Sequence, residues 1–280
     1  MSEYNKEVFE VTRRMCKTDR DLQLSIFDSK RQQRIYTSYP DIPLEGIPLS
    51  GVEPKVYVSN RRTFQAAKLL IKEYKDVCVL NFASAMNPGG GVFNGANAQE
   101  ECLCRASTLY ECISDEDAYR RFYKVHRKEC KSAIYNDDCI FTPNVTVFRR
   151  DNTYYDVLPR EQWYKCSVIS CAAPNLRKVP SNQHNYGGSE SRAVVNNASL
   201  YEIQYKRLCR ILQIAIIEGV DAIVLGAFGC GAFKNPAFVV ANAMADAIER
   251  YKNYFKVIEI AVPDTKYSKE NHDIFAKKFN

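Results

Sequence analysis

The chain has 280 residues, of which 46% are hydrophobic and 26% are charged, a balance typical of a globular protein with a sizeable core. No run of about 18 apolar residues is present, so we expect no membrane span and no membrane partner, and the polar N-terminus is unlike a signal peptide. The net charge of +6 suits a polyanionic substrate, but the basic residues are scattered, which does not identify a nucleic-acid binder.

The cysteines indicate a reduced environment. Their number, 11, is odd, and they are spread along the whole chain, unlike the pattern of a secreted disulfide scaffold. No C-x-x-C pair occurs, and the three histidines are far apart, which argues against a structural zinc site. We therefore expect buried thiols, no metal and no cofactor in an intracellular protein, located in the cytoplasm or, in a eukaryote, also in the nucleus.

Taken in chain order, the hydrophobic pattern predicts helices alternating with strands after a polar, proline-containing segment at 19–54. The predicted elements are helix 4–16, strand 55–58, helix 64–74, strand 77–80, helices 98–113 and 115–130, strands 139–148 and 163–172, loop 173–196, helix 198–218, strand 222–225, helix 237–250, strand 257–262 and helix 268–279. We expect residues 1–54 to form an extension packed on a catalytic domain at 55–280.

This alternation predicts an α/β protein with helices on both faces of a sheet. Two units share one plan, in which a buried strand leads through a glycine-rich loop into a helix, at residues 77–113 and 222–250. Ligands of open α/β sheets bind beyond the carboxyl ends of the strands. Two glycine-rich loops at that edge are what a diphosphate clamp requires.

The first loop carries three consecutive glycines, Gly89, Gly90 and Gly91. Glycine allows unusual backbone conformations, and without a Cβ atom the backbone amides can approach an anion closely. The alternative is a plain turn. The loop is neither a Walker A motif, because no Gly-Lys-Ser/Thr follows, nor a dinucleotide fingerprint, because the glycine spacing differs.

Gln99, Glu100 and Glu101 then open a predicted helix. Acidic residues in a first helical turn often only complement the helix dipole. Here they face a presumed phosphate site, where two carboxylates are costly unless they have a function. A bound diphosphate would raise the pKa of a neighbouring carboxyl, which could then act as a general acid.

The second loop, 226–236, contains two phenylalanines among its glycines, which is unusual for a solvated loop. Phe228 and Phe233 can each either plug the core or stack on a base or a ribose. The sequence alone leaves both alternatives open for each ring.

Residues 81–91, followed after seven residues by Gln99, Glu100 and Glu101, resemble the signature of poly(ADP-ribose) glycohydrolases, and are most similar to the compact bacterial-type branch. Residues 226–235 resemble the second diphosphate loop of the same fold, the macrodomain. The likeness covers roughly residues 55–265, and the N-terminal extension resembles that of the same branch more loosely.

The resemblance implies a three-layer α/β/α macrodomain-like mixed sheet with an N-terminal helical and loop extension. It implies metal-independent hydrolysis of the ribose–ribose O-glycosidic bonds of poly(ADP-ribose), releasing ADP-ribose from chain ends. Glu101 would be the general acid and then the base, and Glu100 would hold the ribose. The residues implied in substrate binding are Asn87, Gly89, Gly90, Gly91, Val92, Gln99, Gly229, Cys230, Gly231, Ala232 and Phe233.

Two other functions remain open at this stage. The first is a binding module that recognises ADP-ribose without cleaving it, although such a module does not need Glu100 and Glu101. The second is a hydrolase of another ADP-ribose adduct, such as ADP-ribosylated DNA or O-acetyl-ADP-ribose. The expected partners are poly(ADP-ribose), ADP-ribose and ADP-ribosylated proteins, and we expect a monomer.

Overall fold

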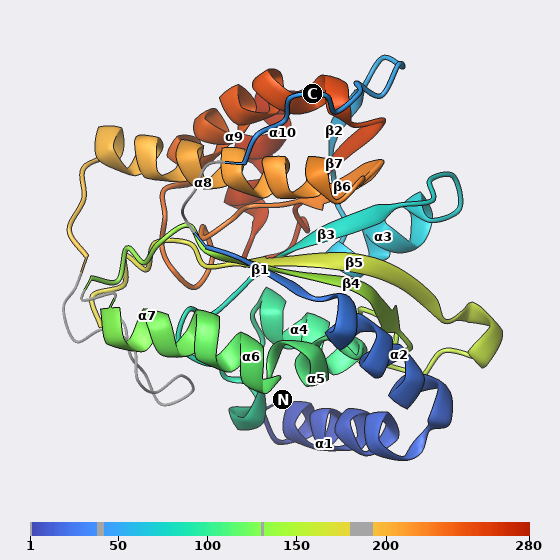
Figure 1. Cartoon of the computed structure of the whole chain (residues 1–280). Helices are drawn as coiled ribbons and strands as arrows, with labels where there is room; N and C mark the ends of the chain where they lie inside the picture. Colours follow the sequence, from blue (N-terminus) through green and yellow to red (C-terminus); the bar gives the residue numbers. More distant parts are fainter. Residues whose placement is uncertain (1, 38–41, 130–131, 180–192) are drawn as a thin grey trace.

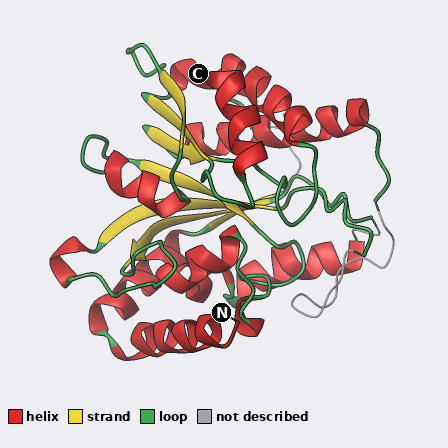
Figure 2. Cartoon of the chain, turned by 180° about the vertical axis from the view of Figure 1, so that it is seen from behind, coloured by secondary structure: helices red, strands yellow, loops and turns green. Residues whose placement is uncertain are grey.

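The computed structural model describes residues 2–37, 42–129, 132–179 and 193–280. Over these residues, a seven-stranded mixed sheet lies between two layers of helices (Figure 1; Figure 2). The expected three-layer α/β/α fold is therefore confirmed. Within the same ranges, no helix is both long enough and apolar enough to span a membrane.

The strands follow the order β1-β4-β5-β3-β6-β7-β2 across the sheet. Their bounds are β1 (Arg34–Tyr36), β2 (Lys55–Ser59), β3 (Val77–Phe82), β4 (Cys139–Val147), β5 (Tyr164–Cys171), β6 (Ala222–Leu225) and β7 (Val257–Ala261). The five strands from β5 to β2 are parallel, whereas β4 runs antiparallel to both β5 and β1. Every predicted strand is present, and β1 is an addition that the sequence pattern did not predict.

The helices divide between the two faces. Their bounds are α1 (Ser2–Thr18), α2 (Arg20–Gln32), α3 (Thr63–Leu70), α4 (Gln99–Ala106), α5 (Leu109–Ile113), α6 (Glu116–Ala118), α7 (Lys124–Glu129), α8 (Asn197–Ile217), α9 (Ala237–Tyr251) and α10 (Lys269–Phe279), with short turns η1 (Val92–Asn94), η2 (Tyr119–Tyr123, a π-helix), η3 (Arg160–Gln162) and η4 (Lys252–Tyr254). In Figure 1, α8, α9 and α10 cover one face of the sheet, while α1, α2 and α4 to α7 cover the other.

The central strand β3 contributes to both halves of the core, because successive side chains of a strand point to opposite faces. Val77 and Val79 pack in the cluster that includes α3 and α4. Cys78 and Leu80 pack in the cluster that includes α8 and α9. All four side chains are buried, so β3 is fixed from both sides, and the loop that follows it starts from a rigid position.

One helix was not predicted. α2 is strongly polar, which hid it in the sequence, but Asp19 caps its first turn by accepting hydrogen bonds from the backbone amides of Asp21 (3.0 Å) and Leu22 (3.1 Å). Leu22 is fully buried against Phe148 and Cys16. Capping and one well-buried side chain thus hold a helix whose exposed face is charged.

The predicted helix 98–113 is wrong in one respect, because it breaks between α4 and α5. Ser107 forms an isolated bridge with Val147, and the Thr108 amide donates to the Thr146 carbonyl (3.0 Å), so these residues pair with β4 instead of continuing the helix. Helix 64–74 likewise ends at Leu70, and 115–130 divides into α6, η2 and α7. Of the predicted loop 173–196, residues 180–192 lie outside the described residues, as does residue 130.

The N-terminal segment, residues 2–37, contacts the rest of the structure at several points. β1 forms the outer strand next to β4, and α1 packs against η1 and α4. Asn5 Nδ2 donates to the Gly95 carbonyl (3.1 Å), and Thr12 Oγ1 donates to the Arg105 carbonyl (2.7 Å). The division into an extension that ends at residue 54 and a domain that begins at residue 55 stays a prediction. The segment before residue 54 contacts the elements on either side of the first glycine-rich loop.

Candidate active site

The two glycine-rich loops leave the same edge of the sheet. The first follows β3 and the second follows β6, and these two strands are parallel neighbours. Where the loops begin, the rings of Phe82 and Phe228 pack edge to face with their centroids 5.7 Å apart. Because ligands of open α/β sheets bind at the carboxyl ends of strands, these loops and the start of α4 form the candidate site.

The first loop requires glycine at its centre. Gly89 and Gly90 have φ angles of +68° and +58°, in the left-handed region. A Cβ atom on Gly90 would lie 2.6 Å from Glu101 Oε1 and 3.1 Å from Glu100 Oε2. Both carboxyl groups therefore stand directly against the loop, and no larger residue fits between them and the backbone.

Glu101 joins this loop to α4. It occupies the third position of the helix, and its side chain is 7% exposed. Its Oε2 accepts a hydrogen bond from the Ala98 amide (2.9 Å), which satisfies the N-terminus of the helix. Its Oε1 accepts from the Gly91 amide (2.9 Å). Helix capping and loop anchoring thus fix the position of one carboxylate, so the capping and functional interpretations of this residue are compatible.

Glu100 is more deeply buried, with an exposure of 2%. Its Oε2 accepts from the Ser84 amide (2.7 Å), whereas Oε1 has no hydrogen-bond partner in the structure. Burial and the neighbouring charge of Glu101 raise the pKa of Glu100 well above its ordinary value, against the opposing effect of the Ser84, Asn81 and Gly89 groups. The neutral acid is therefore favoured at this position.

Gln99 connects α4 to β3. Its Oε1 accepts from the Phe82 amide (2.9 Å), and its Nε2 donates to the Leu80 carbonyl (2.8 Å) and to Thr63 Oγ1 (3.1 Å). All three bonds are to protein groups, so the side chain fixes the helix to the end of the central strand. Its predicted part in substrate binding stays a prediction.

Asn87 is held by an arginine that the sequence did not single out. Arg127 Nη2 donates to Asn87 Oδ1 (2.5 Å), and its Nε donates to the Met86 carbonyl (2.7 Å). The same guanidinium donates to the Tyr119 hydroxyl (3.1 Å) and lies over that ring at 5.5 Å. Arg127 therefore connects α7 and η2 to the first loop. It lies 40 residues after Asn87, and no local motif marks it.

Val92 begins η1 and is fully buried in the core cluster that also contains Leu103 and Phe9. Its amide donates to the Gly89 carbonyl (3.1 Å), which closes the turn of the glycine loop. The side chain anchors the loop, so any contact of Val92 with substrate involves its backbone.

In the second loop, residues with little or no side chain are exposed next to buried residues. Gly231 and Ala232 are exposed, and a Cβ atom on Gly231 would meet no atom within 4 Å. Cys230 is buried, and Gly229 has a φ of +79°. Phe233 is half-buried against the core, which leaves one part of its ring accessible, and its stacking on adenosine or ribose stays a prediction.

The burial of Phe228 decides between core packing and ligand stacking for this ring. It is fully buried, so it plugs the core rather than stacking on a ligand.

Asn235 holds this loop in shape, and sequence reasoning missed it. Its Nδ2 donates to the carbonyls of Pro174 (2.7 Å) and Gly229 (3.1 Å), and its Oδ1 accepts from Gln204 Nε2 (2.9 Å). A Cβ atom on Gly229 would lie 2.8 Å from Asn235 Nδ2, so this glycine is needed for the close approach. In the sequence, an asparagine before a proline is typical of an ordinary turn, so nothing local indicated that Asn235 holds the loop in shape.

Among the residues that the structure describes, no group of three or more His, Cys, Asp or Glu side chains is arranged to hold a metal ion. Ten cysteines lie in these residues, and all ten are buried free thiols. Burial raises the pKa of the Cys230 thiol in the second loop to about 12, which makes it a poor nucleophile.

Comparisons with known proteins decide the family. The model of the microbial-type PARG catalytic domain matches residues 7–150, just over half of the chain. The chain belongs to the microbial-type poly(ADP-ribose) glycohydrolase (PARG) family. The matched residues include the first glycine loop, Glu100 and Glu101, so the expectation of an enzyme rather than a non-catalytic binding module is confirmed.

Solved microbial PARG structures share the whole fold. The poly(ADP-ribose) glycohydrolase of Thermomonospora curvata is 28% identical, with a TM-score of 0.82 over 98% of this chain and 99% of that chain. The same enzyme bound to the inhibitor ADP-HPD is 27% identical, with a TM-score of 0.78 and the same coverage. The Deinococcus radiodurans PARG in complex with ADP-ribose is 28% identical, with a TM-score of 0.74 over 90% of this chain and 96% of that chain. No curated protein sequence matches the chain significantly.

Proposed function

We propose that this PARG hydrolyses the ribose–ribose O-glycosidic bond of poly(ADP-ribose) and releases ADP-ribose from chain ends, with Glu101 as general acid and then general base. The observation that carries the proposal is the contact between two buried carboxyl groups and Gly90 in the triple-glycine loop of a PARG family member. In this proposal Glu101 is the catalytic residue and Glu100 holds the ribose.

The chemistry needs one proton and one activated water. The bond breaks through an oxocarbenium-like transition state, and the leaving ribose hydroxyl must be protonated as it departs. Two adjacent buried carboxyl groups resist carrying two charges, so the pair of Glu100 and Glu101 favours holding one proton. Glu101 delivers a proton to the leaving oxygen, and the resulting carboxylate then deprotonates the attacking water.

The geometry favours different roles for the two acids. Backbone amides of Gly91 and Ala98 orient both oxygens of Glu101, which suits a group that must give up a proton and then take one from water at a fixed position. Glu100 Oε1 has no protein partner, so this oxygen can accept a hydrogen bond from a ribose hydroxyl while the proton of the pair is on Glu101.

The remaining substrate contacts follow from the two loops. The amides of Gly89 to Gly91 and of the second loop, 229–233, would hold the diphosphate, and Phe233 would stack on the adenosine or its ribose. Asn87, oriented by Arg127, would bind hydroxyls of the distal ribose. The polymer would be attached to ADP-ribosylated proteins, and the enzyme would act on it as a monomer. The buried free thiols support an intracellular location.

Product analysis on defined substrates tests the proposal. Wild-type protein is incubated with poly(ADP-ribose), ADP-ribosylated DNA and O-acetyl-ADP-ribose, and the products are separated by chromatography over time. We expect free ADP-ribose from the polymer from the earliest time points, with no burst of intermediate-length oligomers. Release from the DNA or acetyl adduct but not from the polymer would overturn the proposed substrate, and early oligomers would overturn cleavage from chain ends.

A further inference from the structure

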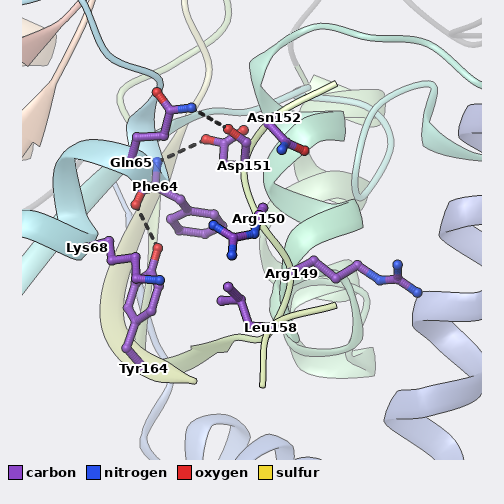
Figure 3. Close-up of a pocket in the computed structure, with 9 residues that line it drawn as sticks. All are labelled: Phe64, Gln65, Lys68, Arg149, Arg150, Asp151, Asn152, Leu158 and Tyr164. Carbon is purple, nitrogen blue, oxygen red and sulfur yellow. Dashed lines mark hydrogen bonds between the residues drawn. The ribbon is translucent and has the colours of Figure 1, made fainter. Parts of the chain in front are cut away.

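A cavity lies apart from the glycine-rich loops. It has a volume of about 150 Å³ and lies between α3, the first residues of β5 and the segment 149–158 that follows β4 (Figure 3). Its lining residues are Phe64, Gln65, Lys68, Arg149, Arg150, Asp151, Asn152, Leu158 and Tyr164. Phe64, Leu158 and Tyr164 are buried and form an apolar wall, and the Tyr164 hydroxyl is already bonded to the Phe64 carbonyl (2.7 Å).

The rim of this cavity is positively charged. Arg150 and Lys68 both line the cavity, Lys68 from α3 and Arg150 from the segment that follows β4 (Figure 3). Burial, and then the charges of Arg150 and Lys72, lower the pKa of Lys68. Among the described residues, no acidic side chain forms an ion pair with Lys68 or Arg150.

The other charged residues of the lining are already bound. The Arg149 side chain points away from the cavity (Figure 3). Outside the cavity its guanidinium donates to the Tyr155 carbonyl (2.8 Å) and contacts Met15 Sδ (3.7 Å). Asp151 is buried and is paired with Arg62 (2.7 Å), and it also accepts from the Phe64 amide (3.1 Å). Lys68 Nζ donates only to the neutral Gln162 Oε1 (3.5 Å), so the net charge that a ligand meets is that of Lys68 and Arg150.

We propose that this cavity binds one phosphate group of a nucleoside phosphate chain, with the attached ribose or base lying on the wall of Phe64, Leu158 and Tyr164. Arginine and lysine together suit a phosphate, and a cavity of about 150 Å³ holds a single ring or phosphate but no whole ADP-ribose. The site would take a unit of poly(ADP-ribose) beyond the unit held by the glycine loops, and in this respect it rests on the proposed function.

The position of α3 supports this use. Its first residue, Thr63, accepts a hydrogen bond from Gln99 of the catalytic segment (3.1 Å). Lys68 follows on the same helix, about 7.5 Å further along the axis at 1.5 Å per residue. In this proposal a polymer chain bound at the catalytic loops runs along α3 to this cavity, whereas a single ADP-ribose in the catalytic site does not reach it.

The test is a charge reversal, Lys68→Glu with Arg150→Glu, assayed on long poly(ADP-ribose) and on an oligomer of two units. We expect the KM for the long polymer to rise about tenfold, with kcat unchanged and with cleavage of the short oligomer unchanged. The matched control is Lys17→Glu with Lys277→Glu, two exposed helical lysines outside the cavity, which changes the net charge equally. We expect this control to have little effect at physiological salt, because distant surface charges are screened.

Three results would overturn the site: an unchanged KM in the cavity variant, an equal rise in the control variant, or loss of activity on the short oligomer. A competition assay separates the ligand classes, with binding of labelled poly(ADP-ribose) to the Glu101→Gln variant challenged by single-stranded DNA. The cavity would be assigned to nucleic acid instead if single-stranded DNA displaced the labelled polymer as strongly as unlabelled poly(ADP-ribose) does, and if the charge reversal abolished this competition by DNA. A wild type that cleaves neither substrate contradicts the proposed function itself, which distinguishes the two failures.

Discussion

At the scale of single residues, the two adjacent glutamates differ in their surroundings more than in their chemistry. Glu101 receives two backbone amides, and Glu100 receives one while its second oxygen stays without a protein partner. The sequence predicted both as candidates from their place after the glycine loop. It could not predict that Glu100 favours the neutral form, because that depends on its burial and on amides from distant residues such as Ser84.

The raised pKa of Glu100 makes folding stability depend on pH. The folded protein keeps the Glu100 proton at pH values where the unfolded chain has lost it, so this group's contribution to stability falls as pH rises above about 4.3, the ordinary glutamate value. The Glu100→Gln variant has no titrating group at this position, so its stability does not fall with rising pH for this reason. We expect its Tm relative to wild type to rise between pH 5 and pH 8, and a difference independent of pH would contradict a neutral Glu100.

Gly90 is the position where a single methyl group should abolish binding. In Gly90→Ala the new Cβ would displace Glu101 Oε1, and the positive φ adds a cost of about 1–2 kcal/mol to folding. The matched control is Gly219→Ala, which has a φ of +72° but no atom within 4 Å. By calorimetry we expect both variants to carry the cost of the positive φ, Gly90→Ala to lose further stability because it displaces the Glu101 carboxyl, and only Gly90→Ala to lose ADP-ribose binding. Retained affinity in a folded Gly90→Ala protein would place the ligand elsewhere.

At the scale of elements, the site is a junction of α4, η1 and α7 with the end of β3. The glycine loop is fixed by Glu101 from α4, by Val92 in η1 and by Arg127 from α7. Behind η1, α1 contributes Asn5, which holds the Gly95 carbonyl. The sequence pattern predicted β3, the loop and the start of α4, but the contributions of α1 and α7 come from distant segments with no local signature.

Arg127 provides a test of this junction. Arg127→Lys keeps the charge but loses the planar fork that bonds the Met86 carbonyl and Asn87 together. We expect KM for poly(ADP-ribose) to rise about five- to tenfold with a smaller change in kcat, because Asn87 loses its orientation. In a double-mutant cycle, adding Asn87→Ala to Arg127→Lys should cost little more than either change alone. Fully additive effects would show that Arg127 acts independently of Asn87, and Tyr119→Phe serves as the control that leaves both bonds to the loop intact.

At the scale of the whole molecule, the alternation of apolar runs and helical patterns predicted the layered fold. It worked where burial is strong, as in Val77–Phe82 and Val257–Ala261, because the core selects continuous apolar residues there. It failed for α2, whose burial rests mainly on Leu22, and for the three-residue β1. The break at Ser107 was also hidden, because it is caused by pairing with β4, which is distant in sequence.

The proposed mechanism uses carboxyl groups and backbone amides without a metal. We expect turnover of poly(ADP-ribose) to be unchanged after dialysis against EDTA, measured as ADP-ribose released per unit time. A loss of turnover on chelation that magnesium or zinc restores would require a metal in the catalytic step.

The most direct test of the central claim is turnover of poly(ADP-ribose) by Glu101→Gln, with ADP-ribose affinity measured in parallel. The substitution keeps the size of the side chain but removes its transferable proton. We expect turnover to fall by about 10²–10⁴-fold or more, while the affinity for ADP-ribose stays close to wild type because both glycine loops are intact. Glu100→Gln, compared under the same conditions, should retain more activity. Turnover of Glu101→Gln near the wild-type rate would contradict the assignment of Glu101 as the catalytic acid.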